Sequence, residues 1–154
     1  IIVDRHRVSM VRVAFVVCGD ADLAEESVQA AWPIAWQRLA SVRDPDRLGA
    51  WLASVAVNEA RQLMRRRRRR AVIEIAVATH ERSTAPDPSA SVDDIDLARA
   101  LANLEPEDRA ILALRYVAGL NSSELGPAVG MSASGLRRRL ARLLDRLRSE
   151  LSDA

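Results

Sequence analysis

Lysine is absent from this 154-residue chain, and several other residue types are scarce. Cys18 is the single cysteine, so no disulfide or thiolate metal cluster can form within the chain. With only two histidines beside it, we expect no metal site and no cofactor. Aromatic residues make up 3% of the chain while 49% is hydrophobic, which favours helices packed through aliphatic side chains.

Long apolar runs are missing as well. No stretch of about 18 apolar residues could cross a membrane, and no signal peptide is visible. We therefore expect a cytoplasmic protein without membrane insertion. The sequence also lacks paired carboxylates, a Ser/His/Asp set and a glycine-rich phosphate loop, so we expect no enzymatic activity.

The charged residues are unevenly distributed. All 23 basic residues are arginine, and the net charge is only +2. Residues 65–82 carry seven arginines against two glutamates, residues 83–108 carry one arginine against seven acidic residues, and residues 109–154 carry eight arginines against four acidic residues. Codon bias in a GC-rich genome would account for much of the missing lysine. Two basic zones separated by an acidic stretch indicate two contacts with nucleic acid.

Apolar spacing predicts an all-α fold made of two small helical domains joined by an acidic linker. We place the first domain at residues 1–77, the linker at 78–94 and the second domain at 95–154. Asp22 is expected to cap the second helix, and Pro33 is expected to kink or break it. The expected helices cover residues 4–18, 23–39, 47–69, 95–104 and 106–116, followed by a helix-turn-helix.

The helix-turn-helix is the most distinctive pattern. Asn121 and Glu124 are spaced as a capping pair, Gly130 suits the turn, and Ser132 suits the N-cap of the last helix. Apolar side chains share one face of that helix, namely Leu136, Leu140, Leu143, Leu144, Leu147 and Leu151. Arginines lie opposite this face and on both of its flanks, which suits a DNA groove or phosphate backbone. An amphipathic bundle helix with a solvated basic face remains the alternative.

A second segment, residues 51–70, combines an aromatic ring, amides and positive charge. These residue types suit unstacked bases and a phosphate track. The side chains concerned are Trp51, Asn58, Arg61, Gln62 and Arg65. For Trp51, a position in the core is an equally open interpretation. The run Arg65–Arg70 predicts only charge-driven, sequence-independent binding.

The order of these segments resembles that of bacterial extracytoplasmic-function (ECF) sigma factors. The matching segments are AEESVQAAW (24–32), WLASVAVNEAR (51–61), the acidic linker, LEPEDRAILALRYVAGL (104–120) and the helix-turn-helix. The resemblance implies a transcription initiation factor that binds core RNA polymerase and directs it to promoters. Its first domain would melt the −10 element, and its second would read the −35 element.

The resemblance also implies roles for individual residues. Glu25, Glu26 and Gln29 match the surface that docks on a coiled coil of the largest polymerase subunit. The −10 DNA would meet Leu48, Trp51, Asn58, Arg61, Gln62 and Arg65, with Asn58 beside a flipped base and Leu48 in the loop that closes over it. The −35 DNA would meet Ser134, Arg137, Arg138 and Arg142. An anti-sigma factor is implied as a further partner.

A free-standing helix-turn-helix DNA-binding regulator is the main alternative. It would explain the last third of the chain but would leave the first domain without a role. Binding to promoter DNA without polymerase would favour this alternative.

Overall fold

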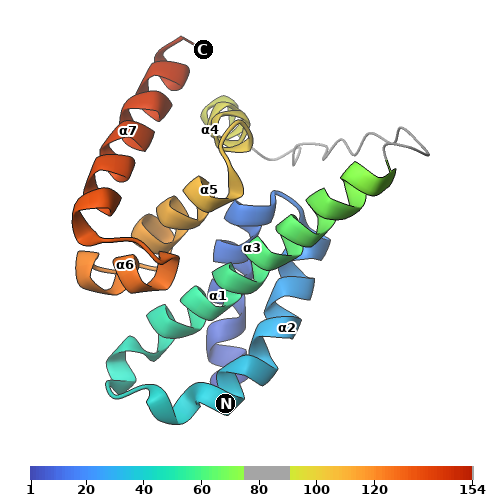
Figure 1. Ribbon diagram of the computed structural model, residues 1–154, viewed down its shortest axis with the longest axis vertical. Coiled ribbons are helices and arrows are strands. Elements are labelled where there is room, and N and C mark those ends of the chain that lie inside the picture. Colours follow the sequence, from blue (N-terminus) through green and yellow to red (C-terminus); the bar gives the residue numbers. More distant parts are fainter. Residues whose placement is uncertain (75–90, 154) are drawn as a thin grey trace.

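The computed structural model describes residues 1–74 and 91–153, and every regular element within these ranges is helical. Three long helices form the first half: α1 (Ile2–Cys18), α2 (Ala21–Arg38) and α3 (Leu48–Glu74). They pack against one another as a three-helix bundle (Figure 1). Their shared core is aliphatic, with Met10, Val17, Val28, Leu52 and Val57 almost fully buried, as the low aromatic content predicted.

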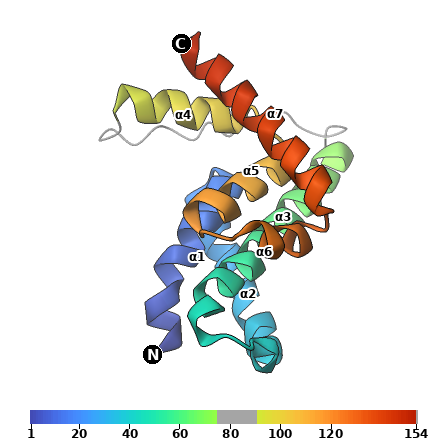
Figure 2. The ribbon, with the colours of Figure 1, turned by 90° about the vertical axis from the view of Figure 1, so that its left-hand side faces the viewer.

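The second half contains four α-helices and a π-helical turn. These elements are α4 (Val92–Ala102), α5 (Pro106–Leu112), the π-helical η3 (Ala113–Val117), α6 (Ser122–Val129) and α7 (Ala133–Ser152). In Figures 1 and 2, α7 extends away from the α1–α3 bundle, whereas α5 lies against it. The predicted all-α architecture with a C-terminal helix-turn-helix is confirmed.

Several local predictions need correction. Asp20, not Asp22, caps α2, because its carboxylate accepts the Leu23 N–H at 3.0 Å. Pro33 does not break α2, which is continuous. A proline removes only one backbone hydrogen bond, and the neighbouring Ala31 and Ala35 are buried in the core, so packing holds the helix together.

The connections between helices also differ in detail from the prediction. Between α2 and α3 lie two 3₁₀ turns, η1 (Leu39–Ser41) and η2 (Pro45–Arg47), and Asp44 caps the second through the Asp46 N–H. α4 begins at Val92, within the predicted 78–94 linker, because Ser91 and Asp94 form a reciprocal capping box. Residues 78–90 of that linker lie outside the described residues.

The helix-turn-helix is built as the sequence predicted. Asn121 and Glu124 form a capping box at α6, and Ser132 caps α7 by accepting the Gly135 N–H at 3.2 Å. Gly130 ends α6 with a φ of 71°, a left-handed conformation that a side chain disfavours. On α7, Leu136, Leu143 and Leu147 are buried and Leu140 and Leu144 are partly buried, whereas Leu151 is exposed because α7 extends beyond its neighbours.

A backbone contact holds the turn closed. The Met131 N–H donates to the Gly126 carbonyl at 2.9 Å, and a Cβ added at Gly126 would lie 2.9 Å from the Met131 carbonyl oxygen. Gly126→Ala is therefore expected to lower the free energy of unfolding by about 1–3 kcal/mol, because backbone must move to relieve the overlap. Denaturant titration of the purified chain measures this loss.

Gly49→Ala is the matched control. Its added Cβ would meet only the His6 ring at 3.4–3.5 Å, an ordinary contact. Because alanine favours helix over glycine, this variant should be neutral or slightly more stable. Equal losses for the two variants would contradict the proposed close approach at Gly126.

Candidate nucleic-acid interfaces

The exposed face of α7 carries all four predicted −35 residues. Ser134, Arg137, Arg138 and Arg142 are exposed. None of these three arginines forms a hydrogen bond or ion pair with the residues that the structure describes. The other arginines of α7 each pair with a carboxylate of the protein: Arg139 with Asp108, Arg146 with Glu150, and Arg148 with Asp145. The face therefore offers unpaired guanidinium groups, which form forked contacts with guanine edges and phosphates.

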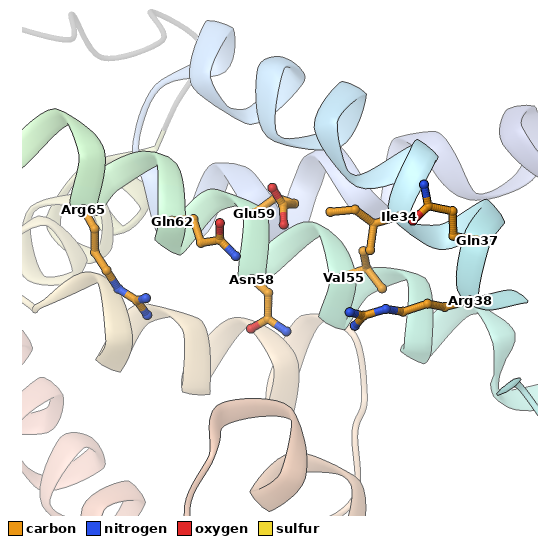
Figure 3. A pocket seen from close by; sticks show the side chains of 8 residues that line it. All are labelled: Ile34, Gln37, Arg38, Val55, Asn58, Glu59, Gln62 and Arg65. Atoms are coloured by element: carbon orange, nitrogen blue, oxygen red, sulfur yellow. The ribbon is translucent and has the colours of Figure 1, made fainter.

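A polar hollow of about 320 Å³ lies between α2 and α3 (Figure 3). Three predicted −10 residues line it: Asn58, Gln62 and Arg65. The sequence did not single out the remaining lining residues, which are Ile34, Gln37, Arg38, Val55 and Glu59. Helical spacing from Asn58 and Gln62 on α3 could have indicated Val55 and Glu59. The residues from α2 could not be indicated in this way, because they approach α3 only through tertiary packing.

Three other predicted −10 residues do not line this hollow. Leu48 and Trp51 are partly buried and pack on the hydrophobic core. Of the two interpretations of Trp51, its packing agrees with a position at the core. Arg61 is partly buried and donates to the Asn58 side-chain oxygen at 3.3 Å, which orients the amide. Burial, together with the charge of Arg65, lowers the pKa of Arg61 from its ordinary value. An arginine nevertheless stays protonated in a protein.

The predicted polymerase-docking residues lie on α2. Glu26 and Gln29 are exposed, and Glu25 is half-buried. The Glu25 carboxylate accepts a hydrogen bond from Arg7 of α1 at 2.7 Å, in an exposed ion pair. Such a pair contributes little stability, so Glu25 could exchange Arg7 for another cation at low cost.

Sequence reasoning missed a set of contacts between the two halves. Arg47, before α3, pairs with both carboxylate oxygens of Glu124 at the start of α6. Arg65 meets Glu107 at 3.5 Å, and Arg68 meets Glu105 at 2.7 Å. No local sequence pattern predicts ion pairs between residues that are 37 to 77 positions apart. Two of these pairs join α5 to α3, and the third joins the start of α6 to the turn before α3.

Arg109 forms the most buried of these contacts. The side chain is 8% exposed, and its Nε donates to the Val17 carbonyl of α1 at 2.8 Å. Its Nη1 donates to the Leu104 carbonyl at 2.7 Å and to Leu101 at 3.3 Å. One guanidinium thus donates hydrogen bonds to carbonyls at the C-terminal ends of both α1 and α4. Helices leave their last carbonyls unpaired, and their C-terminal ends favour positive charge.

Cys18 lies in the core, as predicted. Burial raises the pKa of its thiol, although a contact with the Ser27 hydroxyl at 3.9 Å acts in the opposite direction. Among residues 1–74 and 91–153, no group of three or more His, Cys, Asp and Glu side chains is placed to hold a metal ion. In the same ranges, no helix has the length and apolar character needed to cross a membrane.

A helical bundle joined to a basic helix-turn-helix is the architecture of a DNA-binding transcription factor. Comparison with known families is specific: residues 2–70 match sigma-70 region 2, and residues 100–149 match sigma-70 region 4. The chain is 31% identical over 153 residues to the ECF RNA polymerase sigma factor SigL of Mycobacterium tuberculosis, spanning 97% of this chain and 86% of SigL. The chain belongs to the ECF RNA polymerase sigma factors, which direct RNA polymerase to promoters and are not enzymes.

Further relatives agree with this assignment. The chain is 30% identical over 146 residues to a Xanthomonas campestris protein named RNA polymerase sigma factor RfaY, but spans only 36% of its length. Its fold matches the sigma factor RpoE in complex with the anti-sigma factor NepR from Bartonella quintana (TM-score 0.78, 24% identity, 97% of this chain and 94% of that one). It also matches CnrH in complex with the cytosolic domain of CnrY (TM-score 0.65, 24% identity, 99% and 86%).

Proposed function

We propose that the two halves of this sigma factor make separate promoter contacts. The first domain, residues 1–77, docks on core polymerase through Glu25, Glu26 and Gln29 and holds the melted −10 strand along α3. The second, residues 95–154, reads the −35 element through α7. The observation that supports this division most directly is the pairing pattern of α7, whose three unpaired arginines are the three at predicted DNA positions.

The proposal assigns no catalytic step to this chain. Its site of action is the cytoplasm, where bacterial promoters are transcribed. Because two fold relatives were solved with anti-sigma factors, we also propose that an anti-sigma partner regulates this chain.

DNA binding with and without polymerase distinguishes the proposal from a free-standing regulator. We expect the purified chain to show little sequence preference for promoter DNA alone and clear preference once core polymerase is added. Sequence-specific binding of equal affinity without polymerase would favour the regulator.

Promoter binding requires the two halves to separate. Elements about 25 base pairs apart lie about 85 Å apart along B-DNA. In this structure Glu107 contacts Arg65 on the −10 face, and the adjacent Asp108 contacts Arg139 at the start of α7. One turn of α5 therefore contacts both α3 and α7, so the two proposed DNA-binding helices lie much closer together than the two promoter elements do. We infer that this closed form opens when the chain binds polymerase and DNA.

Breaking the ion pairs between the halves is expected to favour the open form. In the triple variant Glu105→Gln, Glu107→Gln and Glu124→Gln, all three pairs lose their charge, while the glutamine introduced at position 124 can keep the α6 cap. Because the pairs are partly exposed, each contributes less than about 1 kcal/mol, so the open population should rise several-fold in total. Small-angle X-ray scattering should record a larger radius of gyration.

A control variant with the same change in charge breaks only pairs within single helices. These substitutions are Asp96→Asn, Asp145→Asn and Glu150→Gln. The control should leave the radius of gyration unchanged. An identical radius for both variants would contradict the idea that the interdomain pairs hold the closed form.

Acid should act in the same direction as the triple variant. The hydrogen bond from Arg47 holds the pKa of Glu124 below its ordinary value, so the closed form binds fewer protons at this site. The contribution of the pair is therefore fully present above the ordinary glutamate pKa, about 4.3. It is lost as the pH falls through the lowered pKa, and scattering at decreasing pH should record the opening.

A further inference from the structure

The hollow between α2 and α3 has room and chemistry beyond the predicted −10 contacts. Its volume of about 320 Å³ lies within the range of small-ligand pockets, about 300–1,000 Å³. Every lining residue comes from α2 or α3, so the closed second half supplies none of its walls. Arg38 and Arg65 line it from different helices, and guanidinium groups attract the phosphates that flank a base.

Glu59 is the only acidic side chain among the described residues that line the hollow. It is half-buried, and it makes no hydrogen bond or ion pair with any residue in the described ranges. Gln62, three residues further along α3, is its neighbour on the helix surface, and Asn58 lines the hollow as well (Figure 3). A carboxylate acceptor and an amide donor therefore stand side by side facing the space.

We propose that Glu59 is a specificity residue that selects a base carrying an exocyclic amino group. This inference rests on the proposed binding of a flipped −10 base at this face. An ionised carboxylate only accepts hydrogen bonds. Adenine, cytosine and guanine each carry an amino group, at N6, N4 and N2 respectively. This amino group donates a hydrogen bond to Glu59, while the Gln62 amide bonds to a neighbouring ring atom of the base.

Thymine is the base that this arrangement disfavours. It has no amino group, and its single ring N–H lies between two carbonyl oxygens, so a carboxylate that reaches the N–H is repelled on both sides. A polar group left without a partner in a recognition site weakens binding strongly. Glu59 thus acts mainly by rejecting thymine at one promoter position.

Glu59→Gln is the informative variant, because the shape of the side chain is kept while the amide gains the ability to donate. Holoenzyme made with the wild-type chain is tested for transcription on a library of promoters with randomised −10 elements, and holoenzyme made with E59Q is tested in parallel. We expect the wild type to disfavour thymine at one position by roughly tenfold. With E59Q, thymine at that position should come within about threefold of the best base, while preferences at other positions stay unchanged.

The outcomes separate this inference from the function on which it rests. If the wild-type holoenzyme selects no promoter sequence at all, the proposed function fails. If it selects promoters but tolerates thymine at every −10 position, or if E59Q leaves its preferences unchanged, the role of Glu59 is wrong. Unchanged preferences at the remaining positions show that E59Q holoenzyme is folded and assembled.

Discussion

Replacing Arg109 by methionine is expected to lower the free energy of unfolding by about 3–5 kcal/mol. The Val17 and Leu104 carbonyls would each lose a short hydrogen bond from a charged donor, and such bonds contribute about 1.5–3 kcal/mol each. Methionine fills similar space without donating, so the two carbonyls stay buried and unpaired. The variant also removes the hydrogen bond between α5 and α1, which should loosen the closed form.

The measurement is a urea titration of the full chain, with Arg99→Met as the control. Arg99 is 70% exposed and pairs with Asp96 within α4, so its loss should change stability by less than about 1 kcal/mol. Arg109→Lys should recover only part of the stability, because an ammonium lacks the fork that reaches both helix ends. Similar stabilities for Arg109→Met and Arg99→Met would show that Arg109 does not connect the halves.

Removing the three unpaired arginines of α7 is expected to cause the largest functional loss. In the variant with Arg137, Arg138 and Arg142 changed to Ala, affinity of the holoenzyme for a −35-containing promoter should fall at least about 100-fold. An arginine that contacts a base contributes about 1–3 kcal/mol. Each lost phosphate contact reduces the steepness of the plot of log affinity against log salt concentration by about one. Because these side chains are exposed, helix content and stability should not change.

A double variant on the same helix provides the comparison. Arg146→Ala and Arg148→Ala remove exposed arginines that already pair with Glu150 and Asp145. Promoter binding at two salt concentrations should show a much smaller loss for this variant. Equal losses for the two variants would mean that α7 contributes general positive charge instead of a defined reading face.

Local sequence patterns were sufficient to predict most of the fold. Leucine spacing predicted the buried face of α7, and the capping box at α6 and the cap of α7 were found where the sequence predicted them. The start of α4 was missed although Ser91 and Asp94 carry the S-x-x-D spacing of a capping box. Pro33 was expected to kink or break α2, because the backbone hydrogen bond that a proline removes can be read from the sequence. The packing that keeps the helix continuous depends on residues elsewhere in the chain and cannot be read in this way.

The candidate sites were predicted only where one helix supplies the residues. On α7, period 3.6 predicted which side is buried, and the resemblance to ECF sigma factors singled out Ser134, Arg137, Arg138 and Arg142 among the exposed residues. Arg109 could not be distinguished among 23 basic residues, because its role depends on two helix ends that meet it in space. For the same reason Arg38 of α2 and the pairing of Arg47 with Glu124 became visible only in the structure.

Run-off transcription with core polymerase tests the central claim most directly. Four reactions use templates that carry candidate promoters. They contain core polymerase alone, core polymerase with the intact chain, and core polymerase with either the Asn58→Ala or the Arg138→Ala variant. We predict that the intact chain confers initiation at defined promoters, that Asn58→Ala impairs opening at the −10 element, and that Arg138→Ala weakens −35-dependent promoters. If core polymerase gains no promoter specificity from the intact chain, the account is contradicted.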